Sequence, residues 1–136
     1  MEGDTVMQVY YFTRTGRSRE IAEQIASRYQ TTARKIDDHK DWSGKVNYMK
    51  AGYMSLSRKT IPVDYVEPDL SDEIVVVFPL WAGTMPPGVK TFVEAVGKEK
   101  ITAVVTSLGS TMKQRDGFRK IIDLVGENIT APDSVE

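Results

Sequence analysis

The chain has 136 residues, of which 40% are hydrophobic and 27% are charged, and its formal net charge is -1. This length fits a single domain, which we expect to span residues 1–136. The near-neutral charge argues against a dedicated nucleic-acid-binding protein. With no cysteine and one histidine, His39, the sequence excludes disulfides, thiol nucleophiles and metal sites built from several cysteines or imidazoles. Any redox chemistry therefore needs an organic cofactor.

The sequence carries no export or membrane signal. Its N-terminus is acidic at Glu2 and Asp4 and is followed by no long apolar run. The longest apolar stretch, 74–82, is far shorter than the roughly 20 residues of a membrane helix. We expect no membrane insertion and a cytoplasmic protein.

The first part of the chain predicts strand, loop and helix in succession. β-branched and aromatic residues over 6–12 indicate a strand that is buried on both faces. Residues 13–18 are a polar loop, and apolar residues between 21 and 29 then recur at helical spacing. Residues 32–36 indicate a second short strand. A weaker helical pattern, interrupted by a glycine, occupies 46–56.

A proline-containing linker at 61–72 leads to the clearest strand, 74–78, whose lack of alternation predicts a central place in a parallel sheet. Residues 79–87 form a loop. Apolar residues then recur at i, i+3, i+4 and i+7 over 89–96, and a glycine follows, which indicates a helix and its end.

The last third of the chain predicts a strand at 101–106 and a polar loop at 107–114. Apolar residues at helical spacing over 118–125, again followed by a glycine, indicate another helix. Residues 128–131 indicate a last short strand. The whole alternation predicts an α/β fold with a doubly wound parallel sheet.

Ligands of such sheets bind beyond the carboxyl ends of the strands, which here are followed by loops 13–18, 79–87 and 107–114. The loop at 13–18 has the features of a phosphate site, because backbone N–H groups at a helix N-terminus attract an anion. Gly16 allows close approach of the backbone, and Thr13, Thr15 and Ser18 add hydroxyl donors. The alternative is that Thr15 simply caps the helix.

The sequence Thr13-Arg14-Thr15-Gly16-Arg17-Ser18 matches the T-x-T-G-x-[ST] phosphate loop of the flavodoxin family. Residues 79–86 resemble the family's loop after the third strand, and 106–110 resemble its loop after the fourth strand. The resemblance spans roughly residues 6–126. It implies a five-stranded sheet in the order 2-1-3-4-5, bound FMN, and a flavin ring held between the two later loops.

The resemblance implies cofactor-binding residues in all three loops, and it implies no catalytic residue and no metal ligand. The implied residues are Thr13, Arg14, Thr15, Gly16, Arg17, Ser18, Pro79, Leu80, Trp81, Ala82, Gly83, Ser107, Leu108, Gly109 and Ser110. A tryptophan at the end of a strand can stack on a flat ring, and we expect this of the tryptophan in the second loop. The alternative is a tryptophan that covers the edge of the core, which is our interpretation of Trp42.

Members of this family are typically very acidic, whereas the two later loops here contain no acidic residue and the last carries Lys113. Arg14 and Arg17 lie within the first loop. A less negative surrounding stabilises the anion of the reduced flavin, so we expect a less negative reduction potential than in acidic flavodoxins. His39 has no evident partner in the sequence and is interpreted as a solvated turn residue.

Three functions follow from the resemblance. The first is an FMN-binding redox protein that transfers electrons between protein partners. The second is an FMN-dependent oxidoreductase that reduces a quinone or a similar small acceptor, a class that includes flavodoxin-like protoporphyrinogen oxidases. The third is a flavin-free binding module with the same fold. Whether the chain is an enzyme or a carrier stays open.

The flavodoxin-like fold ends in a helix that covers the face carrying the first helix, and this last helix is missing from the predicted elements. The ten residues after Gly126 are too few for a helix of typical length, about 11 residues. We therefore expect part of that sheet face to lack cover, so that strand residues, among them Val9 and Tyr11 or Val75 and Val77, are left partly bare. Residues 45–58, a partner domain or a homodimer could cover it, and we favour the homodimer.

Overall fold

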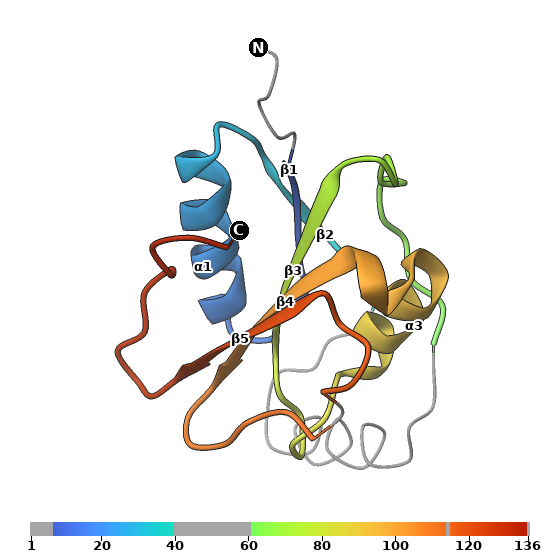
Figure 1. Ribbon diagram of the computed structural model, residues 1–136. Coiled ribbons are helices and arrows are strands. Elements are labelled where there is room, and N and C mark those ends of the chain that lie inside the picture. The colour runs from blue at the N-terminus through green and yellow to red at the C-terminus, as the bar shows by residue number, and fades with distance from the viewer. Residues whose placement is uncertain (1–6, 40–60, 114, 136) are drawn as a thin grey trace.

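The computed structural model describes residues 7–39, 61–113 and 115–135, which contain a five-stranded parallel sheet in the order β2-β1-β3-β4-β5 (Figure 1). The strands are β1 (Met7–Tyr11), β2 (Ala33–Lys35), β3 (Glu73–Pro79), β4 (Ile101–Ser107) and β5 (Lys120–Val125). The helices are α1 (Arg17–Arg28), α3 (Pro87–Val96) and the 3-10 turn η1 (Lys98–Lys100). The predicted α/β class and strand order are confirmed. Trp42 and the predicted helix at 46–56 lie outside the described residues.

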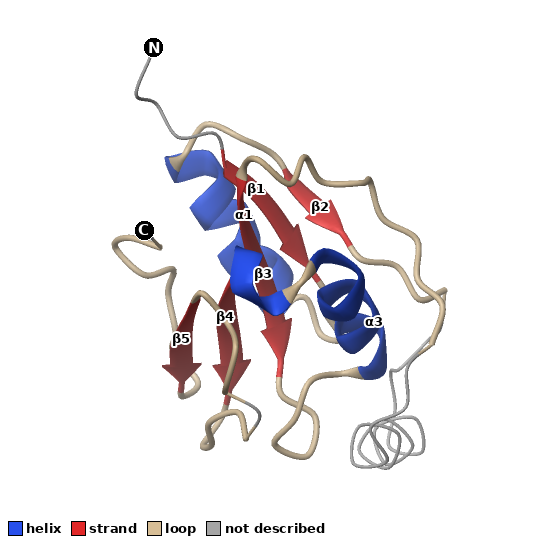
Figure 2. Ribbon diagram, turned by 45° about the vertical axis from the view of Figure 1, so that its right-hand side comes forward, coloured by secondary structure: helices blue, strands red, loops and turns tan. Residues whose placement is uncertain are grey.

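The helices α1 and α3 lie on opposite faces of the sheet (Figure 2). Side chains alternate between the faces along each strand, so Val9 contributes to the cluster under α1 while Tyr10 contributes to the cluster under α3. All seven residues of β4 are buried, as are the five central residues of β3. The continuous apolar runs of these strands follow from cover on both faces. Among the described residues no helix is long and apolar enough to cross a membrane.

The predicted helix over 118–125 is wrong, because residues 120–125 form β5. They pair in parallel with β4, from Thr102↔Lys120 to Ser107↔Val125. A short apolar run satisfies helical and extended spacing equally well, and here a run rich in β-branched residues decides for the strand. Residues 115–119 and the described part of the preceding loop contain no helix.

The predicted strand at 128–131 is also wrong, because the segment 127–135 is irregular and packs over α1. Ala131 and Val135 are buried in the cluster on that side of the sheet. The backbone N–H of Val135 donates to the Tyr29 hydroxyl over 3.2 Å, and that of Ala131 donates to the Gln24 side-chain oxygen over 3.1 Å. The expected bare patch is therefore absent where it was placed, since its residues are all buried: Val9, Tyr11, Val75 and Val77.

Candidate functional site

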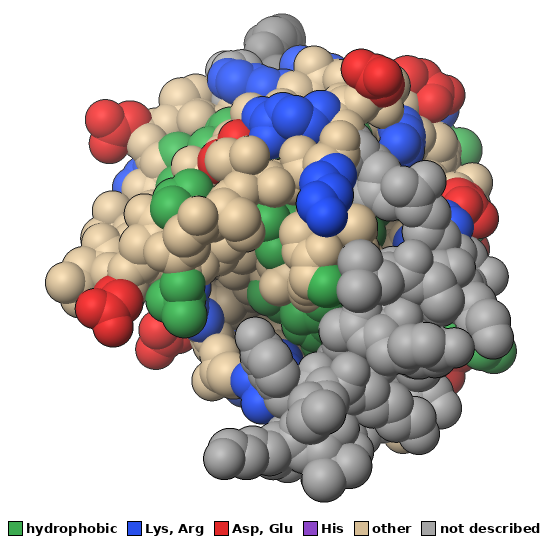
Figure 3. All heavy atoms as spheres, turned by 90° about the horizontal axis from the view of Figure 1, so that it is seen from below, with side chains coloured by type: hydrophobic (Ala, Val, Ile, Leu, Met, Phe, Trp, Pro, Cys, Tyr) green, Lys and Arg blue, Asp and Glu red, His purple; other side chains and the backbone are tan. Residues whose placement is uncertain are grey.

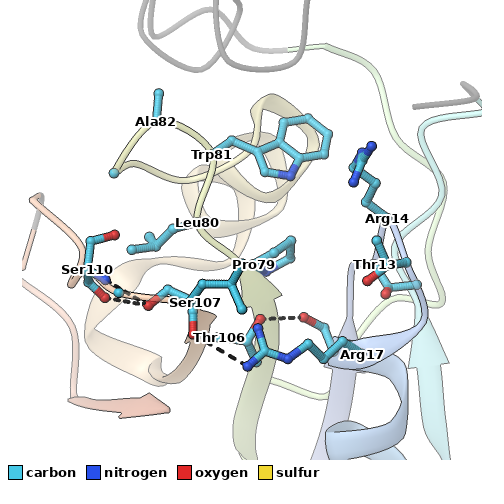
Figure 4. Close-up of a pocket in the computed structure, with 15 residues that line it drawn as sticks. Thr13, Arg14, Arg17, Pro79, Leu80, Trp81, Ala82, Thr106, Ser107 and Ser110 are labelled. Atoms are coloured by element: carbon cyan, nitrogen blue, oxygen red, sulfur yellow. Dashed lines mark hydrogen bonds between the residues drawn. The ribbon is translucent and has the colours of Figure 1, made fainter. Parts of the chain in front are cut away.

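The loops that follow β1, β3 and β4 meet around a cavity of about 530 Å³ at the carboxyl ends of these strands (Figure 4). Its volume lies in the range of small-molecule and cofactor sites. The first loop contributes Thr13, Arg14, Thr15, Arg17 and Ser18, the second contributes Pro79, Leu80, Trp81, Ala82 and Gly83, and the third contributes Thr106, Ser107, Leu108, Gly109 and Ser110. Sequence analysis names all of these as cofactor-binding residues except Thr106, which it includes only in the loop 106–110. Of the residues that it names, Gly16 alone does not line the cavity.

The loop at 13–16 turns sharply into α1 through Gly16. This residue has φ 95°, in the left-handed region that favours glycine. Its N–H donates to the Thr13 hydroxyl over 2.9 Å, and its carbonyl accepts from the Glu20 N–H over 3.0 Å. Gly16 is the N-cap of α1, and no side chain caps the helix. The interpretation of Thr15 as a cap is therefore wrong, and the first-turn N–H groups are left for an anion.

The start of α1 is fixed to the end of β4 by polar contacts. The Ser18 and Thr106 hydroxyls form a hydrogen bond of 2.9 Å, and both residues are almost completely buried. The Arg17 guanidinium donates to the Ser107 carbonyl over 3.4 Å. These contacts fix the two walls of the cavity, at the start of α1 and at the end of β4, relative to each other. Sequence reasoning placed Thr106 in the loop 106–110 but did not predict it as a site residue, although a hydroxyl at the end of a buried strand beside a glycine-containing loop was an available signal.

The second loop contains a tight turn at the tip of β3. Trp81 and Thr84 exchange backbone hydrogen bonds of 3.0 and 3.1 Å, and the two residues between them, Ala82 and Gly83, both have positive φ. Trp81 is only 5% exposed, and its ring packs edge to face against the Phe12 ring with 5.3 Å between the ring centroids. Trp81 thus belongs to the core and forms a wall of the cavity at the same time. Its stacking on a flavin stays a prediction.

The third loop is attached to the second. The Lys113 N–H donates to the Gly83 carbonyl over 3.0 Å, and a Cβ atom added to Gly83 would lie 3.1 Å from the Lys113 Cε. Met112, a residue of this third loop, is buried in the core and anchors the loop there. Leu108, by contrast, is 70% exposed at the rim of the cavity. The two loops that border the cavity beyond β3 and β4 therefore form one connected wall.

The cavity has a basic character. Arg14 and Arg17 line it, and no Asp or Glu is among its described lining residues. In Figure 4 Arg14 extends toward the Trp81 ring and Arg17 toward Ser107. Figure 3, a view of the end where this cavity opens, shows several Lys and Arg side chains in the upper half of the face and most Asp and Glu side chains near its outline. An anionic ligand is favoured here.

Arg115, two residues after Lys113, is directed to β5. Its guanidinium donates to both carboxylate oxygens of Asp123, over 3.2 and 2.8 Å. These hydrogen bonds are the main reason why the pKa of Arg115 is raised. It is not among the residues that line the cavity.

His39, interpreted from the sequence as lacking a partner, has two. Its Nε2 lies 2.5 Å from Asp64 Oδ2, and its Nδ1 lies 3.5 Å from Asp37 Oδ2. The hydrogen bond with Asp64 and the charge of Asp37 raise the pKa of His39. This cluster lies beyond β2 and outside the cavity lining, and no described residues form a group of acidic or imidazole side chains able to hold a metal ion.

Solved structures share this arrangement of strands and helices. A flavoprotein from Lactobacillus acidophilus, crystallised in complex with FMN, superposes with a TM-score of 0.69 at 16% identity and covers 89% of this chain and 92% of its own. The fold is flavodoxin-like. A protein from Bacteroides uniformis assigned as a flavoprotein matches this flavodoxin-like chain with a TM-score of 0.68 at 20% identity, over 91% of this chain and 92% of its own.

No family model matches the flavodoxin-like chain. An uncharacterized protein of Archaeoglobus fulgidus is 29% identical over 110 residues, which cover 80% of this chain and 70% of that protein.

Proposed function

We propose that the chain binds FMN in the cavity between its three loops and acts as a redox protein that transfers electrons between protein partners. The observation that carries this proposal is the convergence of the three loops on the start of α1, which has no side-chain cap. A structural neighbour that was crystallised with FMN supports the same cofactor.

The residues of the cavity fit the parts of this cofactor. The N–H groups at the start of α1 and the Thr15 hydroxyl would hold the phosphate, with Arg17 adding positive charge. The connected wall of the second and third loops would border the ring, where Trp81 and Leu80 exclude water. FMN supplies the electron-transfer chemistry when bound, and the protein contributes position and electrostatics.

A second candidate is an FMN-dependent oxidoreductase on the same scaffold that reduces a quinone or a similar small acceptor. The basic cavity lining favours it, because Arg14 and Arg17 stabilise negative charge that develops on a cofactor or a substrate. Rapid mixing with NADH or NADPH distinguishes the two functions. Reduction of the flavin within seconds supports the enzyme, and reduction by a protein donor alone supports the carrier.

A fluorescence titration tests cofactor binding. FMN should bind at least tenfold more tightly than riboflavin, because riboflavin leaves the N–H groups at the start of α1 without their anion. Thr15→Ala should weaken FMN binding by roughly tenfold or more through loss of a hydroxyl donor to a charged group. Thr31→Ala, just past the other end of α1, is the matched control and should bind as the wild type does. Equal affinities for FMN and riboflavin would contradict the proposal, and no binding of either would favour the flavin-free module.

A further inference from the structure

Buried polar side chains gather on one side of the cavity. Three of the polar residues that are buried in the described part of the chain border the cavity where α1 meets the end of β4: Ser18, Thr106 and Ser107. Elsewhere α1 packs on the sheet through apolar side chains. Burying a hydroxyl costs free energy unless the hydroxyl is hydrogen-bonded. Polar burial under α1 therefore coincides with the end of the helix that faces the cavity.

Two consecutive residues of α1 contact two consecutive residues of β4. The Ser18 and Thr106 hydroxyls form their hydrogen bond over 2.9 Å, and the Arg17 guanidinium reaches the Ser107 carbonyl over 3.4 Å (Figure 4). A hydrogen bond has a preferred direction, whereas apolar packing has none. The two contacts therefore fix the rotation of the first turn of α1 as well as its distance from β4.

The hydroxyls of Thr15 and Ser18, which sequence analysis groups as phosphate donors, have different surroundings. Thr15 is exposed and lines the cavity just before α1 begins. Ser18 also borders the cavity, but it is 1% exposed and its hydroxyl is engaged with Thr106. A ligand can therefore reach the Thr15 hydroxyl, whereas the Ser18 side chain offers almost no surface to it.

We propose that, with FMN bound as proposed, Ser18 and Thr106 are positioning residues for its phosphate and the Ser18 hydroxyl is not a phosphate donor. The phosphate is held by N–H groups of the first turn of α1, which have no partner within the helix. Such groups need to be held to within about 0.5 Å of their binding geometry. Thr106 holds them by fixing Ser18, so a residue of β4 determines how tightly the N-terminus of α1 binds an anion.

Fluorescence titration with FMN and with riboflavin tests the role of Thr106. Thr106→Val should raise the dissociation constant of FMN by about tenfold and leave that of riboflavin nearly unchanged, because riboflavin has no phosphate. Thr106→Ser keeps the hydroxyl and should restore most of the affinity for FMN. Thr102→Val is the matched control, since Thr102 is a buried threonine of the same strand that does not line the cavity. It should keep the wild-type preference for FMN over riboflavin.

The double variant Ser18→Ala/Thr106→Val separates positioning from stability. It leaves neither hydroxyl without a partner, so urea denaturation should show it to be more stable than Thr106→Val. Its affinity for FMN should stay as low, because the contact between α1 and β4 is still missing. A folded Thr106→Val variant with the wild-type preference for FMN, or a double variant that regains affinity together with stability, overturns the positioning role and leaves the proposed function standing. A wild type that does not bind FMN overturns both.

Discussion

The strands β4 and β5 lie side by side in register, and both are rich in β-branched apolar residues, yet every residue of β4 is buried and none of β5 is. β4 has a strand on either side, whereas β5 has one neighbour at the margin of the sheet. Because β4 and β5 have similar compositions, their position in the sheet decides how far their residues are buried. The two strands also end differently: β4 ends in groups that line the cavity, and β5 lies at the margin of the sheet.

The sharpest test of this comparison is a pair of identical substitutions. Ile101→Ala, in fully buried β4, should destabilise the protein by about 2–5 kcal/mol through lost contacts and a cavity. Ile121→Ala, in half-buried β5, should cost less than half as much, because the site is already partly hydrated and can relax. Urea denaturation of both variants measures the difference. Equal losses of unfolding free energy would show that the edge strand is buried in solution.

The next test concerns the polar end of β4. Thr106→Val leaves the buried Ser18 hydroxyl without its partner, and we expect a loss of about 1–3 kcal/mol of unfolding free energy. Adding Ser18→Ala removes the second hydroxyl and should recover part of that loss. Thr130→Val, at an exposed position after β5, should change stability little. If Thr106→Val is as neutral as Thr130→Val, the hydroxyl pair contributes nothing to holding α1 on β4.

Charge substitutions in the loop between β4 and β5 test which of its side chains lies near the bound flavin. With FMN bound, Lys113→Glu should make the reduction potential of the flavin more negative by about 80 mV, because the reversal changes the charge by two units and each unit near a partly exposed ring is on the order of 1 kcal/mol. Arg115→Glu should shift it less, because Arg115 is directed to Asp123 on β5 while Lys113 contacts the wall of the cavity. Spectroelectrochemical titration measures both. Equal shifts would mean that the two side chains are equally far from the flavin.

The smallest effect is expected at the opposite edge, beyond β2. The pKa of His39 is raised by Asp64 and Asp37, so its contribution to stability is complete below the unfolded-state value of about 6.5. That contribution is lost as the pH rises through the higher pKa of the folded state. His39→Gln should remove this pH dependence, and Asp64→Asn should lower the pKa that NMR titration reports. A pKa of His39 that Asp64→Asn leaves unchanged contradicts the contact.

Structural features that depend on neighbouring residues in the sequence could be predicted. Contacts between residues far apart in the sequence could not. The three loops follow from local patterns at the ends of apolar runs, whereas the order of the strands and nearly the whole cavity lining followed from the resemblance to the flavodoxin family. The hydrogen bond between Ser18 and Thr106 joins residues 88 apart, and that between His39 and Asp64 joins residues 25 apart. No local pattern encodes such pairs.

The two wrong predictions of secondary structure both fall in the last third of the chain. Residues 120–125 satisfy a helical spacing, and only pairing with β4, which the periodicity does not contain, makes them a strand. The cover of the sheet face beside α1 comes from single buried side chains, Ala131 and Val135, in a segment without regular structure. Sequence periodicity has no signal for such a segment.

The contact between Val135 and Tyr29 has a consequence for how the chain folds. It joins residues 106 apart, and it completes the packing of the first helix with a segment that is synthesised much later. Contacts of such long range carry a large loop-closure entropy and slow folding. A chain still emerging from the ribosome can form β1 and α1 but cannot finish burying that helix until segment 131–135 has appeared. Until then the side of α1 that segment 131–135 covers stays exposed to chaperones and proteases.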